Sequence, residues 1–546
     1  MIRKLLPYAK KYRLFAILSP LAIVCEVLIE VIIPLLMSII VDCGISGQSL
    51  SDKESFIADI LISLGFGDLV GTDLILATGG LMFSIAMISL ACGAGAAYFA
   101  AKAGMGFGAE LRKGIFNKIQ DFSFSNIDKF STGSLITRMT TDINMVQMAF
   151  MMAIRMLIRS PLMFAMAISM AFSINKKLSL IFMCIAPIMF ALILLIGAAA
   201  HKRFTKLFKK YDKLNNYIQE TLIGARVVKA FVRSKHEKGK FRVSNDEIKD
   251  ASIFAEKLII LNNPIMAVSI YTCIILVLWV GAKLILGGDM YLGDLMSFIT
   301  YIQQIFMSLM MISMIFVMSV MAKASMNRIC EVLEEKPDIN DENADESATV
   351  KDGSIEFRNV CFKYSKNAEN NVLKDINLTI KSGETVGILG GTGSAKTSLV
   401  QLIPRLYDTT EGEVLVGGRN VKDYKLHVLR DSVSMVLQTN LLFSGTIEEN
   451  LRWGNENATL DEIRAAAKIA QADDFVMSFP DGYKTDLGQG GVNVSGGQKQ
   501  RLCIARAILK KPNVLILDDS TSAVDTATDG RIREGMKNLL PDTTKI

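Results

Sequence analysis

Charged residues are scarce in this sequence. Asp, Glu, Lys and Arg make up only 21% of the 546 residues, whereas 51% are hydrophobic. This balance excludes an intrinsically disordered chain and an ordinary soluble enzyme. The eight cysteines form no Cys-x-x-Cys pair and have no regular spacing, so the sequence predicts neither a disulfide framework nor a zinc site. The net charge of +6 is not gathered into one patch, which argues against a nucleic-acid partner.

Long apolar runs fill the first part of the chain. Six of them reach the roughly 20 residues that a helix needs to cross a bilayer. The first run is too long for the apolar core of a cleavable signal peptide, so we expect it to stay as a membrane anchor. We therefore predict a transmembrane domain over residues 1–330 of a multi-pass protein in the lipid bilayer of the cell membrane. The expected spans are about 15–41, 74–101, 145–174, 178–200, 258–282 and 295–322.

The distribution of Lys and Arg sets the orientation of these spans. Five basic residues precede the first span, whereas residues 43–73 contain one basic residue against five acidic ones. Because cytoplasmic loops carry the excess of positive charge, the N-terminus is predicted to be cytoplasmic. Residues 102–142 and 201–257 are then cytoplasmic as well. Both are rich in helix formers, so we expect helical extensions of the neighbouring spans.

The composition changes after the last span. Residues 331–350 are acidic, contain Pro337 and lack an apolar period, which is typical of a linker. From there to the end, residues 351–546 alternate short apolar strands with helical stretches. This alternation predicts an α/β domain, which on this orientation is cytoplasmic.

A glycine-rich stretch near the start of this domain predicts a phosphate-binding loop. Residues 385–389 are expected to form a strand, and a helix is expected to begin near Thr397. Backbone N–H groups of such a loop turn toward phosphate, while Lys396 reaches the β- and γ-oxygens and the Thr397 hydroxyl binds Mg²⁺. The loop consists of Gly390, Gly391, Thr392, Gly393, Ser394, Ala395, Lys396 and Thr397.

Two further motifs complete a nucleotide site. An apolar strand over 513–517 ends in Asp518 and Asp519, an arrangement that places a carboxylate on the magnesium of a P-loop site. Between the two motifs, Ser495, Gly496 and Gly497 precede a helix whose N-terminus suits another phosphate. With six spans, a phosphate loop, Val-Ser-Gly-Gly-Gln and a double acid in this order, the chain resembles the ATP-binding cassette (ABC) family over essentially its whole length.

The resemblance implies a half-transporter of the exporter type. Its fold would be an α-helical membrane domain with six spans and long cytoplasmic extensions, fused to an α/β P-loop nucleotide-binding domain. Two halves would form an ATPase that uses ATP and Mg²⁺ to move amphipathic or lipophilic, multidrug-type compounds out of the cell by alternating access. The tips of the cytoplasmic loops, near 122–128 and 219–231, would dock on the nucleotide-binding domains.

The resemblance also assigns residue roles. Tyr364 would stack on adenine, and Gln438 would contact Mg²⁺ and the attacking water. Asp518 would bind Mg²⁺, and Asp519 stands at the position of the catalytic base. Asp525 would lie in the loop that crosses the dimer seam. The γ-phosphate of the ATP held by the opposite subunit would be bound by the turn of Ser495, Gly496, Gly497 and Gln498.

The chain departs from the family pattern at several positions. Asp519 replaces the usual glutamate base and is one methylene shorter, so we expect slow hydrolysis at this chain's own ATP site. Ala395 replaces the last glycine of the phosphate loop. The chain reaches Ile546 where the next strand would begin, so residues 351–546 look like an incomplete domain without the position of the family's switch histidine. A weakened base beside an intact serine-glycine turn favours a subunit of an asymmetric heterodimer over a homodimer.

The cargo is left open by the sequence. Glu26 and Glu30 lie one turn apart in the first span, and Arg155 and Arg159 have the same spacing in the third. The glutamates form a candidate transport path for a cationic or zwitterionic cargo, or an ion pair with the arginines, or they face a water-filled vestibule. We expect the arginines to reach the membrane interface. An ATP-gated regulatory subunit and a homodimeric lipid or peptide exporter remain alternatives.

Overall fold

The computed structural model describes residues 2–53, 55–342, 344–365 and 368–546. It divides into two compact units. The helical unit comprises Met1–Lys118 and Gly133–Glu334, and the mixed unit comprises Ile119–Thr132 and Glu335–Ile546. The mixed unit thus contains residues 119–132, which lie within the range 1–330 that the sequence assigns to the membrane domain.

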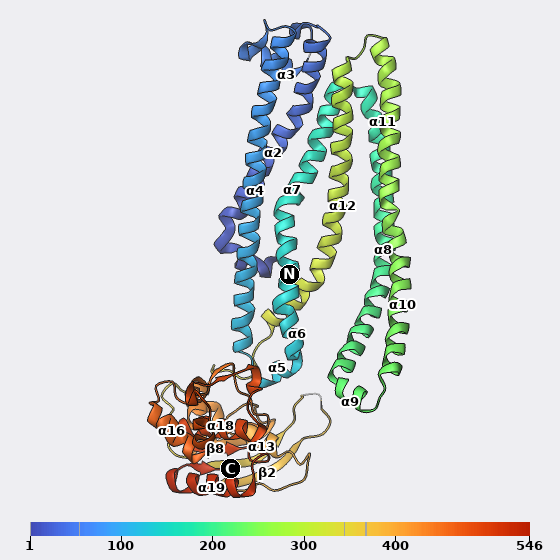
Figure 1. The fold of residues 1–546 in the computed structure, drawn as a ribbon. Helices are drawn as coiled ribbons and strands as arrows, with labels where there is room; N and C mark the ends of the chain where they lie inside the picture. Colours follow the sequence, from blue (N-terminus) through green and yellow to red (C-terminus); the bar gives the residue numbers. More distant parts are fainter. Residues whose placement is uncertain (1, 54, 343, 366–367) are drawn as a thin grey trace. The chain divides into compact units, whose positions relative to one another are not determined.

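Long helices build the helical unit (Figure 1). Six stretches within the described ranges are long and apolar enough to cross a membrane, which confirms the predicted number of spans. A π-helical turn, Ile40–Ile45, continues α2. The helices are α1 (Ile2–Ala9), α2 (Arg13–Ile39), α3 (Phe56–Leu61), α4 (Thr72–Gln120), α6 (Thr132–Thr137), α7 (Ile143–Ile174), α8 (Lys176–Ile223), α9 (Ala225–Ala230), α10 (Ser234–Ile260), α11 (Asn262–Leu286) and α12 (Leu292–Glu334).

Several helices are far longer than a bilayer requires. Helix α4 has 49 residues, α8 has 48 and α12 has 43, whereas about 20 residues suffice to span the hydrocarbon core. The prediction that the spans continue as helical extensions is therefore confirmed. The short helix α9 lies at the turn between α8 and α10.

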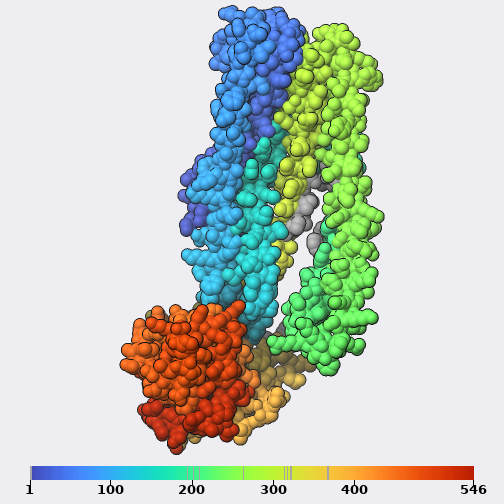
Figure 2. Space-filling view, viewed as in Figure 1, coloured from blue at the N-terminus to red at the C-terminus, as the bar shows by residue number. Residues whose placement is uncertain are grey.

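The helical unit contains two groups of helices. Helix α7 packs against α2 and α12, and α8 packs against α10 and α11. Helix α12 joins the groups, because it also contacts α8 and α11. Figure 2 shows the lower parts of α8 and α10, in green, standing apart from α4 and α7, in blue and teal, with an open space between them.

A buried ion network ties the loop after α2 to the start of α12. The Lys53 ammonium lies 2.5 Å from Asp42 Oδ2 and 3.0 Å from both Asp294 Oδ1 and Ser38 Oγ. Asp42 also accepts the backbone N–H of Gly293 at 2.6 Å. The single basic residue of the 43–73 segment is thus a buried cross-link, which charge counting could not show.

The mixed unit combines sheets and short helices (Figure 1). One antiparallel sheet has the order β2-β1-β3-β4, and a parallel sheet has the order β5-β8-β9. The strands are β1 (Ile355–Phe362), β2 (Leu373–Ile380), β3 (Glu411–Val416), β4 (Arg419–Asn420), β5 (Val433–Val436), β6 (Gly445–Thr446), β7 (Asp486–Leu487), β8 (Val514–Leu517) and β9 (Thr544–Lys545). The helices are α5 (Phe124–Phe130), α13 (Lys396–Gln401), α14 (Leu426–Ser432), α15 (Ile447–Arg452), α16 (Leu460–Ile469), α17 (Asp473–Met477), α18 (Gly496–Leu509) and α19 (Thr526–Leu539).

The regular strand predicted over 385–389 is not present. Thr385 forms only an isolated parallel bridge with Lys545, and Val386 donates its N–H to Lys545 O at 2.9 Å. A strand needs a neighbouring ladder, and the segment that pairs here, β9, is two residues long. The chain therefore enters the glycine-rich loop from an extended segment instead of a regular strand.

Candidate nucleotide-binding site

The phosphate loop is a tight turn that ends where α13 begins. Helix α13 starts at Lys396, one residue before the predicted start. Ala395 precedes it in the left-handed conformation, with φ 63° and ψ 24°. The Lys396 ammonium donates to the carbonyl oxygens of Gly390 at 2.7 Å and Gly391 at 3.1 Å, so its side chain folds back over the loop. In this position the ammonium lies where phosphate oxygens can replace the carbonyls as its acceptors.

The two expected magnesium ligands meet beside this loop. The Thr397 hydroxyl donates to Asp518 Oδ1 at 3.0 Å. The second carboxylate oxygen, Asp518 Oδ2, is buried and has no hydrogen-bond partner in the described part of the chain. A hydroxyl and a carboxylate oxygen are hard oxygen donors of the kind that Mg²⁺ prefers. The donor set at this position therefore fits the ion.

Gln438 and Asp519 meet at the same edge of the parallel sheet. Strands β5 and β8 are parallel neighbours, so residues that follow their carboxyl ends come together. Gln438 Nε2 lies 3.4 Å from Asp519 Oδ2. Asp519 adopts a left-handed backbone, with φ 51°. The structure thus brings the predicted base, the predicted water-positioning amide and the magnesium aspartate into one place.

Tyr364 follows β1 and offers an accessible ring. It is 49% exposed, and its hydroxyl lies 2.8 Å from Ser398 Oγ at the start of α13. Its ring contacts Phe362 and Tyr407 at centroid distances of 4.9 Å and 5.2 Å. A fixed ring with an accessible face suits stacking on a base.

The serine-glycine turn caps helix α18. Gln498 donates its backbone N–H to Ser495 Oγ at 3.3 Å, and Ser495 donates its own N–H to Gln498 Oε1 at 2.8 Å. A Cβ on Gly497 would lie 2.7 Å from the carbonyl oxygen of Ala523, so this position has no room for a side chain. No hydrogen bond between described residues joins this turn to the phosphate loop of the same chain.

Asp525 caps α19 through its side chain. Its Oδ1 accepts the backbone N–H of Thr528 at 2.9 Å, and this hydrogen bond holds the pKa of the carboxyl below its usual value. The loop before it is fastened by Gln500, which accepts the N–H of Ala523 at 3.0 Å and lies 3.3 Å from Ser522 Oγ. Sequence reasoning missed Gln500, although it lies two residues after Gln498 and is 4% exposed.

Comparison with known proteins shows which protein family both units resemble. A model of the ABC transporter transmembrane region matches residues 16–309, and one described as ABC transporter matches residues 373–522. The ABC transporter ATP-binding protein YfiB of Bacillus subtilis is 36% identical over 98% of this chain and 89% of its own length. An ATP-dependent lipid A-core flippase of Desulfotalea psychrophila is 32% identical over 80% of this chain and 76% of its own length.

The chain belongs to the ABC transporter family. It is an ABC exporter half-transporter, a multi-pass membrane protein with six spans followed by an ABC nucleotide-binding domain. The expected fold class and the ATPase activity coupled to transport are thereby confirmed. A half-transporter works with a second half, and its ABC domain binds ATP.

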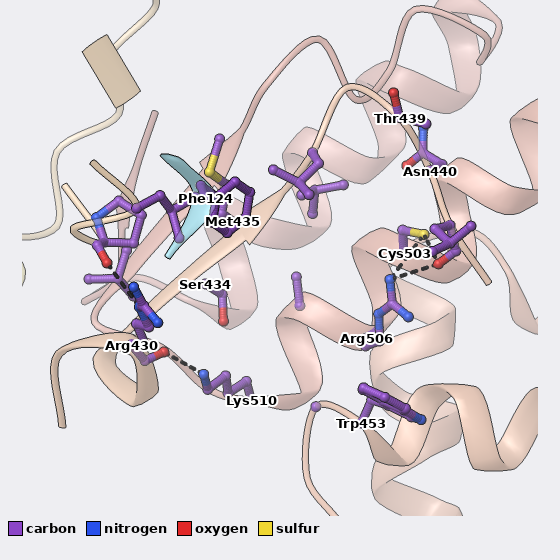
Figure 3. A pocket seen from close by; sticks show the side chains of 18 residues that line it. Phe124, Arg430, Ser434, Met435, Thr439, Asn440, Trp453, Cys503, Arg506 and Lys510 are labelled. Carbon is purple, nitrogen blue, oxygen red and sulfur yellow. Dashed lines mark hydrogen bonds between the residues drawn. The ribbon is translucent and has the colours of Figure 1, made fainter. Parts of the chain in front are cut away.

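The ABC domain also contains a cavity of about 350 Å³ beside β5 (Figure 3). Phe124 of α5 and Trp453 are among the residues that line it. Burial raises the pKa of the Cys503 thiol in its wall. Arg506 donates to Leu441 O at 3.2 Å, and Lys510 donates to the carbonyl oxygen of Arg430. The cavity is therefore lined by both aromatic rings and cations, and each of these two cations donates to a backbone carbonyl oxygen.

Replacing Ala395 by glycine is expected to tighten MgATP binding about fivefold. The Ala395 methyl group stands in the loop that surrounds the phosphates, and glycine removes it and lets the loop amides adjust to the bound nucleotide. The left-handed strain of a residue with a Cβ, roughly 1–2 kcal/mol, acts on stability with and without nucleotide. Isothermal titration of the intact transporter with MgATP measures the change. The control is Gln471→Gly, because Gln471 is also left-handed, with φ 55°, and follows α16 in the same domain. Equal effects of the two glycines on affinity would contradict the prediction.

Proposed function

We propose that this chain is one subunit of an asymmetric heterodimeric exporter whose own ATP site is hydrolytically impaired. The main support for this proposal is Asp519, which occupies the position of the catalytic base. Its carboxylate is one methylene shorter than that of glutamate and lies at the edge of hydrogen-bond reach from Gln438, at 3.4 Å. A displacement of about 1 Å at a reacting group can cost on the order of 10²-fold in rate.

Nucleotide binding at this site should persist. Lys396 and the loop amides would hold the phosphates, Tyr364 would stack on adenine, and Thr397, Asp518 and Gln438 would hold Mg²⁺, which neutralises phosphate charge. The meeting of Thr397 with Asp518 and the unpaired Asp518 Oδ2 support this assignment. ATP would therefore occupy the site for long periods.

The intact turn at Ser495 supports the asymmetry. Its capping box is complete, and Gln500 holds the neighbouring loop that contains Asp525. Such a turn would bind the γ-phosphate of an ATP held by the partner, whose base position should be a glutamate. The partner's site would then carry most of the turnover.

The cytoplasmic loops would transmit nucleotide-driven closure. Helix α5 already packs within the nucleotide-binding unit, which supports docking of the 122–128 tip. The other tip, at 219–231, exposes Val227 and Phe231 on and beside α9. We propose that this apolar tip docks on a nucleotide-binding domain of the dimer.

The proposed cargo is an amphipathic or lipophilic compound that leaves the cell by alternating access. Arg159 pairs with both Glu26 and Glu30, and its distance to Glu30 Oε2 is 2.8 Å. The ion pair between α2 and α7, one of the alternatives that the sequence left open, is therefore present. Glu26 Oε2 is buried without a partner in the described chain. This oxygen supports a role for Glu26 and Glu30 along the transport path.

Two other functions have support of their own. An ATP-gated regulatory membrane subunit is favoured by Asp519 and Ala395, because both depart from the family pattern at the ATP site and the shorter base at 519 weakens hydrolysis more than binding. A homodimeric lipid or peptide exporter is favoured by the similarity to a lipid A-core flippase. ATP-driven accumulation of a lipophilic cargo in inside-out vesicles separates transport from regulation.

Steady-state ATPase activity tests the asymmetry directly. The full chain is measured in lipid nanodiscs, alone and with a candidate second half-transporter. We expect turnover only with the partner, and its loss when the partner's base glutamate becomes glutamine. Comparable turnover by this chain alone would show that Asp519 is a competent base and that a homodimer is functional.

A further inference from the structure

Tyr407 is one side chain that touches both the candidate adenine platform and α5. Its hydroxyl donates to Asp128 Oδ2 of α5 at 2.7 Å. Its ring stands perpendicular to that of Tyr364, at an interplanar angle of 90°. The same ring makes an edge contact with Phe124 of α5, with centroids 6.0 Å apart. Tyr407 therefore bridges the nucleotide side of this unit and its membrane-connected helix.

The rings around Tyr407 leave little freedom of movement. Phe362 contacts both tyrosine rings, with centroids 4.9 Å from Tyr364 and 5.7 Å from Tyr407. Tyr407 itself is only 9% exposed. Burial and the neighbouring Asp128 carboxylate raise the pKa of Tyr407, so its hydroxyl stays a donor throughout the neutral range. Because packed interiors transmit displacement, a shift of the Tyr364 ring moves Tyr407 as well.

Helix α5 has a second support that is independent of these rings. Asn126 Nδ2 donates to Glu335 Oε1 at 3.0 Å, and Ser125 Oγ donates to Asp338 Oδ2 at 3.0 Å. Along the chain, α5 directly follows α4 and precedes α6. The position of α5 is thus set by the 335–338 segment and by Tyr407, and among these contacts of the described residues it is Tyr407 that also touches Tyr364.

We propose that Tyr407 is a positioning residue that links adenine binding on Tyr364 to the position of α5. The proposal rests on the adenine role of Tyr364 given under the proposed function. Because coupling between two sites is reciprocal, a displacement of α5 must also change the affinity for adenine nucleotide. The adenine ring, and not the triphosphate, is the part of ATP that α5 senses through this contact.

Hydrogen exchange of the α5 amides tests the link. The full heterodimer in nanodiscs is compared without nucleotide, with MgATP and with magnesium tripolyphosphate, which carries the phosphates without adenine. In the native protein, MgATP is expected to slow exchange over 124–130 about fivefold or more, and tripolyphosphate is not. Tyr407→Phe, which removes one oxygen, should abolish the slowing while MgATP still protects residues 390–397. Asp128→Ala removes the acceptor of the same hydrogen bond and should have the same effect.

A matched control separates this link from general loosening. Tyr483 is 6% exposed and donates to Asp473 Oδ1 at the same 2.7 Å, so Tyr483→Phe removes an equivalent hydrogen bond elsewhere in the domain. It should leave the MgATP effect on α5 intact. Equal protection of α5 by tripolyphosphate and MgATP, or retained protection in Tyr407→Phe, would overturn the proposal. If Tyr364→Ala leaves the preferential binding of MgATP over tripolyphosphate unchanged, the adenine role of Tyr364 is wrong. That outcome is distinct from a failure of the link through Tyr407.

Discussion

Replacing Ser495 by alanine is expected to lower ATP turnover of the heterodimer at least about 10²-fold, the usual cost of removing one donor that acts on the reacting group. Ser495 would complete the partner's competent site, so its hydroxyl acts where most hydrolysis occurs. Lys396→Ala in the same chain should weaken nucleotide binding at the impaired site and reduce turnover much less. The measurement is steady-state ATPase activity of the purified heterodimer, together with binding of a fluorescent ATP analogue.

The Ser495 variant also removes a helix cap, and a control must isolate that loss. Thr459 caps α16 with the same capping box, because Glu462 donates its backbone N–H to Thr459 Oγ1 at 3.3 Å and accepts the Thr459 N–H at 3.0 Å. Thr459→Ala should cost about 1 kcal/mol of stability, as Ser495→Ala does through its cap, but leave turnover unchanged. Equal losses from Lys396→Ala and Ser495→Ala, or none from Ser495→Ala, would contradict the asymmetry.

The sequence predicted those features that depend on contiguous residues. Six apolar runs gave six spans, and the phosphate loop, the Ser495 turn and the double acid each lie within a few residues. The family resemblance assigned Gln438 and Asp519 to one ATP site, whereas their direct contact is seen only in the structure.

Features that depend on packing between distant segments could not be predicted. Lys53 pairs with Asp294, which lies 241 positions later, and Tyr407 reaches Asp128 across 279 positions. Neither pair has a local signal, because an ion pair or hydrogen bond between separate helices is set by the tertiary fold. The prediction of a strand over 385–389 was wrong for the same reason, because a strand needs a neighbouring strand as its hydrogen-bond partner.

From the sequence, the ion pair of Arg159 was only one of several interpretations of Glu26 and Glu30, because it too depends on packing between distant segments. The spacing of Glu26 and Glu30 places both on one face of α2, and that of Arg155 and Arg159 does so on α7. Spacing alone does not say which faces meet. The structure shows α2 against α7 with one guanidinium between two carboxylates.

Arg159→Met is expected to destabilise the helical unit by up to about 3 kcal/mol, the lower end of the cost of breaking a buried ion pair from one side, because Arg159 and Glu30 are partly exposed. The change leaves Glu26 and Glu30 without their cation, and Glu26 is 9% exposed. The apparent melting temperature in nanodiscs, followed by size-exclusion chromatography after heating, should fall. Arg155→Met is the matched control on the same face of α7, because no ion pair of Arg155 occurs between described residues and its Nε has no hydrogen-bond partner there.

A neutral replacement of the whole cluster separates structure from transport. The triple variant Glu26→Gln, Glu30→Gln and Arg159→Met removes all three charges, so that no charge of the cluster is left without its partner. We expect the melting temperature to return close to the native value. If vesicle uptake of a cationic amphipathic cargo then remains low while ATPase activity is normal, the carboxylates act on the transport path. Full uptake by the triple variant would assign them to helix packing alone.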